Sequence, residues 1–254
     1  MSKRIRVGLF VTCLVDLVRP QVGFAAVKLL EQAGCDVEIP PTQTCCGQPA
    51  WNAGADRHAS DIARQVIATF ENFDYVVAPS GSCAGMIKRH YPEIFEKDAP
   101  WLSRARALAA KTHELMSFLV RERDVSAVAA KFSGSVCYHD SCSSRREMGV
   151  TSEPRTLLAS VEGLTIKELP DTQTCCGFGG LFSVKYPEIS ERIADSKLAD
   201  VTASGADTLV GGDLGCLLHL SGRMKRQGIT LEVRHAAEVL AGMAGEPALG
   251  EFGK

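Results

Sequence analysis

The chain has 254 residues, of which 45% are hydrophobic and 23% are charged, as in soluble globular proteins. Its formal net charge of −2 offers no general attraction to nucleic acid or to an anionic membrane surface. No apolar run is long enough to span a bilayer, and the length allows one large domain or two of ordinary size.

The first predicted element is an apolar strand over 5–12. Lys3 and Arg4 precede it, as in a secretion signal, but Asp16 follows soon after and no small-residue cleavage site is present. We therefore interpret this segment as a buried strand and expect a cytoplasmic protein. Ten cysteines in that compartment fit reduced, metal-bound thiols better than disulfides, because neighbouring cysteines bridge each other only with strain.

Strands and helices then alternate along the chain. After the first strand, the first half predicts a helix over 22–33, a strand over 35–39, a helix over 62–73 and a strand over 75–79. The second half predicts a strand over 135–138, a helix over 154–160, a strand over 164–169, a helix over 189–201 and a strand over 208–212. This alternation indicates parallel sheets with crossover helices.

A ten-residue stretch occurs twice, at 38–47 and at 168–177, with differences only at its second and fourth positions. Each copy contains a Cys-Cys-Gly motif with one cysteine upstream and one downstream. The spacing from Cys13 to Cys45 is 32 positions, and from Cys142 to Cys175 it is 33. We therefore predict an α/β fold of two pseudo-symmetric, Rossmann-like lobes. The expected division is a first repeat over 1–125, a second over 133–242 and a tail over 243–254.

The cysteines of each repeat all follow predicted strands. In a parallel sheet the loops that follow strands gather at the carboxyl edge, so widely spaced cysteines can meet there. We expect one site of Cys13, Cys45, Cys46 and Cys83 and a second site of Cys142, Cys175, Cys176 and Cys216. We also expect the two sites to face each other across the interface between the lobes.

Two kinds of metal centre compete for these sites. An iron–sulfur cluster needs several thiolates around one inorganic core, and glycine after the cysteine pair lets the backbone pass close to it. Zinc would only hold the fold together, and its ligands usually come as close C-x(2–4)-C pairs; neither expected set contains one, although Cys137 and Cys142 stand at such a spacing in the second repeat. The pattern favours iron–sulfur, while zinc or bare thiols remain alternatives.

Several motifs resemble the cysteine-rich Cys-Cys-Gly family, which includes the cysteine-rich subunit of heterodisulfide reductase and the iron–sulfur subunit of glycolate oxidase. The motifs are LFVTCLVD (9–16), CCGQPA (45–50), SGSC (80–83), CCGFGG (175–180), GCL (215–217) and AEVL (237–240). The resemblance covers almost the whole chain, and it looks stronger to the lactate-utilization members than to the others.

This resemblance implies a cytoplasmic iron–sulfur subunit, of 4Fe-4S type, in a complex that oxidises L-lactate to pyruvate. It also implies two partners, a ferredoxin-like iron–sulfur subunit and a third lactate-utilization subunit, without which the chain would be inactive. Alternatives are a subunit of a glycolate or other 2-hydroxy-acid oxidase, a heterodisulfide-reductase-type subunit, or a zinc-stabilised interaction module.

The repeats depart from the fullest family pattern at one position each. Heterodisulfide reductase relatives close each repeat with Cys-x-x-Cys, whereas Met86 and His219 stand at those places here. Those relatives carry non-cubane clusters that use five thiols, so four thiols suit an ordinary four-iron cluster or a partly filled site. We expect Met86 to be packing, and we favour a helix-face role for His219 over an iron ligand.

The remaining cysteines and histidines have plainer interpretations. Cys35 and Cys137 are expected to be small buried residues. His113 and His235 are interpreted as solvated or core histidines late in each repeat. His139 and Asp140 could relay protons beside Cys142, or the Asp140 carboxylate could bond local backbone amides. No nucleotide, flavin or ferredoxin-type motif is present in the sequence, and it identifies no catalytic residue.

Overall fold

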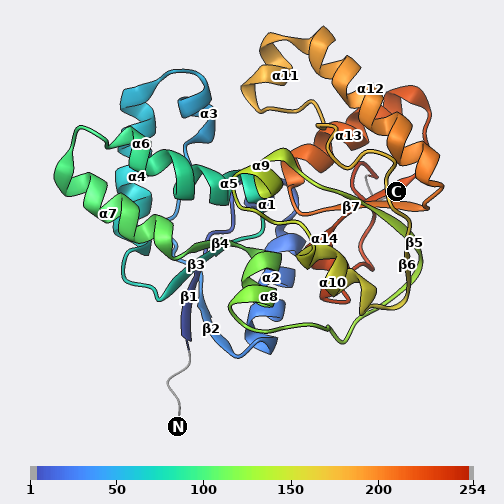
Figure 1. Cartoon of the computed structure of the whole chain (residues 1–254), viewed down its shortest axis with the longest axis horizontal. Helices are drawn as coiled ribbons and strands as arrows, with labels where there is room; N and C mark the ends of the chain where they lie inside the picture. The colour runs from blue at the N-terminus through green and yellow to red at the C-terminus, as the bar shows by residue number, and fades with distance from the viewer. Residues whose placement is uncertain (1–4, 252–254) are drawn as a thin grey trace.

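The computed structural model describes residues 5–251. Two lobes lie side by side, the first drawn in blue to green and the second in yellow to red (Figure 1). Lys3, Arg4 and the last three residues of the predicted tail lie outside the described part. Within that part, no helix has the length and apolar character required to cross a membrane.

The first lobe alternates short strands with helices. Its strands are β1 (Ile5–Leu9), β2 (Cys35–Glu38), β3 (Tyr75–Ala78) and β4 (Thr112–Glu114). Its helices are α1 (Cys13–Val18), α2 (Pro20–Gln32), α3 (Gln48–Asn52), α4 (Asp56–Phe70), α5 (Gly81–Gly85), α6 (Tyr91–Ile94), α7 (Ala99–Ala110) and α8 (Leu115–Arg121), with a π-helical turn over Met86–His90.

The second lobe repeats this order. Its strands are β5 (Lys131–His139), β6 (Glu162–Ile166), β7 (Thr208–Gly211) and β8 (Glu232–His235). Its helices are α9 (Cys142–Arg146), α10 (Glu153–Ala159), α11 (Leu181–Lys185), α12 (Pro187–Ser204), α13 (Leu214–Gln227) and α14 (Ala236–Leu240).

Each lobe contains one four-stranded sheet in which all paired strands are parallel. The strand orders are β2-β1-β3-β4 and β6-β5-β7-β8, so the first strand of each repeat lies inside its sheet. Apolar residues fill these central strands, as in the fully buried stretch Thr208–Gly211 of β7. The predicted class, α/β with two pseudo-symmetric lobes of parallel sheet, is confirmed.

The two lobes contact each other through equivalent helices. Helices α1 and α9 both begin at the first cysteine of a repeat, and α5 and α13 both contain the last one. Across the interface α1 packs on α13, and α5 packs on α9; likewise α2 packs on α14, and α8 on α10. Each of these four helix contacts thus has a symmetry-equivalent contact. Together they place the helices that contain cysteines at the interface between the lobes.

The helix that contains Cys83 crosses close to the helix that begins at Cys142. A side chain at Gly81 would lie 1.9 Å from the Ser144 hydroxyl, and one at Gly85 would lie 2.1 Å from the Glu147 carboxylate. Glycine is therefore required at Gly81, where a side chain would also lie 2.7 Å from the Ser144 Cα, whereas at Gly85 the Glu147 side chain could move aside. The core is shared in the same way, since one cluster of buried apolar residues runs through both lobes.

Two features of the structure differ from the sequence-based expectations. The outer strands β4 and β8, which supply the fourth strand of each sheet, were not predicted. Ile189, expected on the apolar face of its helix, is 54% exposed at the start of α12. The buried face of that helix is formed further along by Ala194, Lys197, Leu198 and Val201.

Candidate metal centre

The first cysteine set converges at the carboxyl edge of its sheet. The Cys13 sulfur lies 3.8 Å from the Cys45 sulfur, and the Cys46 sulfur lies 3.5 Å from the Cys83 sulfur. Residues 32 and 37 positions apart in the sequence thus form two close thiol pairs. These four thiols, all free, are the donors that the sequence predicted for the first site.

Local caps hold the two outer cysteines of this set at helix starts. The Thr12 hydroxyl accepts a hydrogen bond from the Val15 amide at the start of α1, where Cys13 is the first residue. The Ser80 hydroxyl accepts one from the Cys83 amide at the start of α5. Such caps satisfy amides that the helix leaves free, and here they also fix where each thiol projects.

The second set is arranged in the same way in the other lobe. Cys142 begins α9 behind a Ser141 cap, and Cys216 lies in the first turn of α13. The Cys176 and Cys216 sulfurs lie within 4.8 Å of each other, and Cys175 is close enough to Cys142 to raise the pKa of its thiol. The structure therefore brings together all eight cysteines predicted from the sequence, four in each lobe.

Backbone amides point at the sulfurs of the loop cysteines. The Gly47 amide lies 3.5 Å from the Cys45 sulfur, and the Gly177 amide lies 3.3 Å from the Cys175 sulfur. The Phe178 amide donates to the Cys176 sulfur at 3.4 Å. Amide donors of this kind stabilise negative charge on sulfur, so both loops are built to hold thiolates.

Hydrogen bonding between the thiols favours one thiolate in each set. Bonds from Cys13 and then from Cys46 lower the pKa of Cys45 to about 2. The bond from Cys142 comes first among the causes that lower the pKa of Cys175 to about 2. The pKa values of the partners Cys13 and Cys142 are raised, so each set holds one thiolate beside protonated thiols, and thiolate is the form of cysteine that binds metals.

Gly177 has a conformation that no other residue adopts without strain. Its φ is +85°, and a side chain there would lie 2.4 Å from the Ser190 carbonyl oxygen on α12. The Ser190 hydroxyl in turn donates to the Gly177 carbonyl at 2.8 Å. This close approach fixes the loop with Cys175 and Cys176 against the helix, which explains the glycine in the motif.

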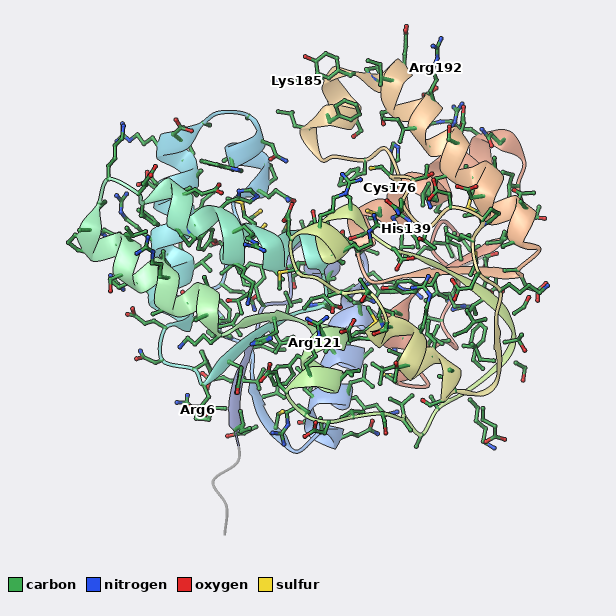
Figure 2. The ribbon with its side chains drawn as sticks, in the orientation of Figure 1. Arg6, Arg121, His139, Cys176, Lys185 and Arg192 are labelled. Atoms are coloured by element: carbon green, nitrogen blue, oxygen red, sulfur yellow. The ribbon has the colours of Figure 1, made fainter. Side chains whose placement is uncertain are left out.

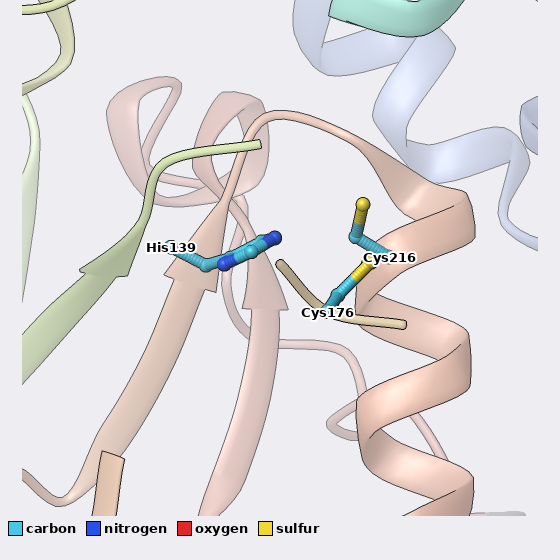
Figure 3. Close-up of side chains that lie close together, drawn as sticks. All are labelled: His139, Cys176 and Cys216. Atoms are coloured by element: carbon cyan, nitrogen blue, oxygen red, sulfur yellow. The ribbon is translucent and has the colours of Figure 1, made fainter. Parts of the chain in front are cut away.

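His139 lies beside Cys176 and Cys216 of the second cysteine set, whereas the sequence suggested a proton relay beside Cys142. It is the last residue of β5 and is 1% exposed. One of its ring nitrogens and the sulfurs of Cys176 and Cys216 all lie within 4.8 Å of one another. Figure 3 shows the ring directed toward the two cysteines, and Figure 2 places it in the interior of the second lobe. Burial lowers the pKa of His139 to about 4, so the ring is neutral.

The neighbouring Asp140 does not bond local backbone amides, and that alternative is wrong. Both carboxylate oxygens instead accept hydrogen bonds from Arg155 at 2.9 Å. Arg155 also pairs with Glu168, so the end of β5, helix α10 and the segment after β6 are connected. Because the Asp140 carboxylate is buried and has few other hydrogen-bond partners, the two hydrogen bonds from Arg155 stabilise its charge.

The other candidates have structural positions that fit their plainer interpretations. Met86 is completely buried, and Cys35 and Cys137 are buried as expected for small core residues. His219 lies half-buried on α13, with Nε2 3.2 Å from the Ser190 hydroxyl and its ring against Phe178.

Two histidines lie on the outer strands. His113 on β4 packs its ring edge-on against Tyr75 and Phe118. His235 is buried at the end of β8, where Nδ1 accepts a hydrogen bond from the Ala237 amide and caps α14. Of the two histidines, interpreted as solvated or core residues, His235 is in the core and also starts a helix, while His113 is only partly buried.

A cavity between the lobes adjoins the first cysteine set. It has a volume of about 160 Å³, and its wall includes all four cysteines of that set together with Phe178, Asp213 and Gly215 from the other lobe. The residues that line it include no arginine, lysine or histidine. The first site thus faces the second lobe, while the expectation that the two sites face each other remains a prediction.

Asp213 links the second lobe to the loop that contains Cys83. Its carboxylate accepts hydrogen bonds from the Ser82 amide at 2.9 Å and from the Ser80 hydroxyl at 3.2 Å. Burial raises the pKa of this carboxyl group. Because Ser80 also caps the helix of Cys83, the position of a first-site ligand depends on a residue of the opposite lobe.

A duplicated α/β scaffold that gathers four thiols at the same place in each copy defines a protein of the cysteine-rich domain class. The sequence model of the family described as CCG, cysteine-rich domain, matches the chain twice, at residues 7–88 and 136–221. Each match spans the three segments that supply the cysteines of one lobe.

Curated relatives narrow this class. Lactate utilization protein A of Bacillus cytotoxicus is 48% identical over 92% of this chain and 98% of its own length. The protein of the same name from Geobacillus sp. (strain WCH70) and lactate utilization protein A 1 of Bacillus cereus (strain AH820) have the same identity and coverage. The chain belongs to the lactate utilization protein A family.

A solved structure shares the fold. The crystal structure of a hypothetical protein from Helicobacter pylori matches 95% of this chain with a TM-score of 0.66 and 10% sequence identity. This chain covers 49% of that protein. At such low identity the similarity concerns the arrangement of helices and strands alone.

Proposed function

We propose that the chain is an iron–sulfur electron-transfer subunit of a cytoplasmic system that oxidises L-lactate to pyruvate. The observation that carries this proposal is the convergence of two sets of four cysteines at equivalent places of two lobes. The relatives named for lactate utilization, 48% identical over 92% of the chain, support the substrate. We further propose a ferredoxin-like iron–sulfur subunit and a third subunit as partners.

The donor sets fit an iron–sulfur cluster better than a structural zinc ion. Each set offers four thiols, with backbone amides aimed at the loop sulfurs and no C-x(2–4)-C pair among its own members. Cys13, Cys45, Cys46 and Cys83 would hold one cluster, and Cys142, Cys175, Cys176 and Cys216 the other. When bound, such a cluster supplies reversible transfer of single electrons.

The residues of the chain contribute position and electrostatics. The caps at Thr12, Ser80 and Ser141 fix the helices that carry the outer cysteines. The amides of Gly47 and Gly177 stabilise sulfur charge, and hydrogen bonds to cluster sulfurs are among the factors that set a reduction potential.

The cavity beside the first set supports electron transfer over lactate binding at this place. A 2-hydroxy acid is an anion, and proteins bind such carboxylates through arginine, lysine or backbone amides. The charged side chain on the wall of this cavity is Asp213, and a carboxylate so close to the cavity disfavours a second one. We therefore assign lactate binding to one of the partners.

Anaerobic reconstitution tests the cluster. Apoprotein incubated with iron, sulfide and a thiol reductant should gain both elements and a visible absorption that dithionite bleaches. A Cys45→Ser, Cys46→Ser, Cys175→Ser, Cys176→Ser variant should lose them, whereas a Cys35→Ala, Cys137→Ala variant should keep them. Colourless protein that lacks iron and sulfide would contradict the proposal, and tightly retained zinc would favour a zinc-stabilised interaction module.

Growth of a deletion strain tests the substrate. A strain without this gene and without another lactate oxidase should not grow on L-lactate as sole carbon source, and the wild-type gene should restore growth where the four-serine variant does not. Normal growth on lactate together with loss of growth on glycolate would replace lactate by glycolate as the substrate.

A further inference from the structure

The two repeats differ at one position directly beneath the metal centre. Phe10 and His139 each stand three residues before the first cysteine of a repeat. The strand register confirms the equivalence: the Phe10 amide bonds the Val77 carbonyl just beyond the β1–β3 pair, and His139 pairs with Gly211 at the end of β5–β7. One scaffold position thus holds a phenyl ring in one lobe and an imidazole in the other.

In the first lobe this position serves packing alone. Phe10 is fully buried, its ring lies 5.5 Å from the Phe70 ring, and it belongs to the same apolar cluster as Cys46. A hydrocarbon ring is therefore sufficient to support the loop of the cysteine pair. Packing does not explain why the second lobe uses a polar ring at this place.

The imidazole of His139 has no ordinary partner. It is 1% exposed, and within residues 5–251 neither Nδ1 nor Nε2 has a hydrogen-bond partner. The nearby carboxylate of Asp140 is occupied by Arg155, so a proton relay from His139 to Asp140 has no hydrogen bond to support it. A buried polar group left unpaired destabilises the folded state, and such a group calls for an explanation such as an ion.

Geometry supplies that explanation. One ring nitrogen and the sulfurs of Cys176 and Cys216 all lie within 4.8 Å of one another, close to twice a metal–ligand bond of about 2.0–2.3 Å. Both sulfurs belong to the second cysteine set, and the ring is directed toward them (Figure 3). A neutral imidazole beside thiolates is a common partner in mixed nitrogen–sulfur metal sites.

We propose that His139 is a nitrogen ligand of the second site, which makes that site mixed in sulfur and nitrogen while the first site has sulfur ligands only. The inference rests on the proposed function, because it takes the bound group to be an iron–sulfur cluster. A four-iron cluster takes four protein ligands, so His139 takes the place of one of the four cysteines of this set, and exchange of thiolate for imidazole raises the reduction potential of such a cluster. The second site is therefore the one with the higher potential, and the two equivalent lobes hold inequivalent redox centres.

Pulsed electron paramagnetic resonance of the reduced protein tests the ligand directly. The Cys45→Ser, Cys46→Ser variant empties the first site, so that the signal comes from the second. After anaerobic reconstitution, this protein should show a strongly coupled nitrogen that changes when histidine alone carries ¹⁵N. His139→Phe, which copies the first lobe, should lose the coupling, and His219→Ala should keep it.

The outcomes separate this inference from the function on which it rests. Iron and sulfide bound without a strongly coupled histidine nitrogen, or with a coupling that persists in His139→Phe, would overturn the ligand assignment alone. Protein without iron and sulfide would overturn the cluster and the ligand together. The ¹⁵N-histidine experiment on the Cys45→Ser, Cys46→Ser variant tests the ligand even if the His139→Phe protein does not fold. As a further control, His139→Cys should keep the cluster but lose the nitrogen coupling.

Discussion

Arg155 connects three segments that lead to the cysteines of the second site. Its guanidinium binds both oxygens of Asp140 at 2.9 Å, and it binds Glu168 at 2.8 Å. The Asp140 side chain is 5% exposed, whereas that of Glu168 is 53% exposed. The pair with Asp140 is therefore the one whose loss matters for stability.

Replacement of Arg155 by methionine keeps much of the side-chain volume and removes the charge. Asp140 would then be a buried carboxylate without a partner, which costs about 3–5 kcal/mol. The exposed pair with Glu168 adds about 1 kcal/mol at most. For a chain of this size each kcal/mol lowers the melting temperature by about 2–4 °C, so we expect a fall of at least about 6 °C.

Arg223→Met is the matched control in the same lobe. Arg223 also forms two hydrogen bonds to one carboxylate, at 2.6 and 2.9 Å, but its partner Asp195 is 39% exposed and can return to water. We expect a clearly smaller loss of stability than for Arg155→Met, because exposed ion pairs contribute little. Thermal denaturation of the reduced apoproteins, followed by circular dichroism, compares the two. Equal losses would refute the argument that burial of the carboxylate sets the cost.

Three further predictions concern the loop, an outer strand and the metal. Gly177→Ala should lower both stability and iron content, because its side chain would meet a carbonyl oxygen at 2.4 Å. Gly228→Ala is the control, since nothing lies within 4 Å of its side chain; it should lower the free energy of unfolding by only about 1–2 kcal/mol and leave the iron content unchanged. Burial raises the pKa of Glu114 to about 7, so the folded state binds more protons than the unfolded state between pH 4.5 and 7. Urea unfolding should show a free energy of unfolding that falls by about 3 kcal/mol as pH rises through this window. The Glu114→Gln variant should lack this fall. A fall that persists in the variant would contradict the assignment to Glu114. Removal of iron from reconstituted protein by a chelator should lower the melting temperature, since the metal binds the folded state alone; an unchanged value would argue against metal held by the fold.

The sequence was sufficient to predict the parts of the fold that repeat strongly. The central strands are apolar, and the alternation with amphipathic helices indicated parallel sheets in two lobes. The convergence of the cysteines followed because loops after parallel strands share one edge. Cys13, although distant from Cys45 in the chain, lies 3.8 Å from it for this reason.

The features that were not predicted depend on contacts distant in the sequence. The outer strands are short and polar, with sequences Thr-His-Glu and Glu-Val-Arg-His, and they are identified as strands only by pairing with β3 and β7. Asp213 gives no sign in the sequence that it bonds Ser80 of the other lobe. A signal for His139 did exist, since alignment of the two repeats on their first cysteines places it opposite Phe10.

The symmetric helix contacts between the lobes have a consequence for a polypeptide that contains only one repeat. Such a half-length chain would leave bare the faces of α1, α2, α5 and α8 that its companion half now covers. Because the contact surface is self-complementary, we expect it to pair with a second copy of itself as a twofold homodimer. Fusion of the two copies removes the need for identical halves, so that one scaffold position can hold a phenylalanine in one half and a histidine in the other.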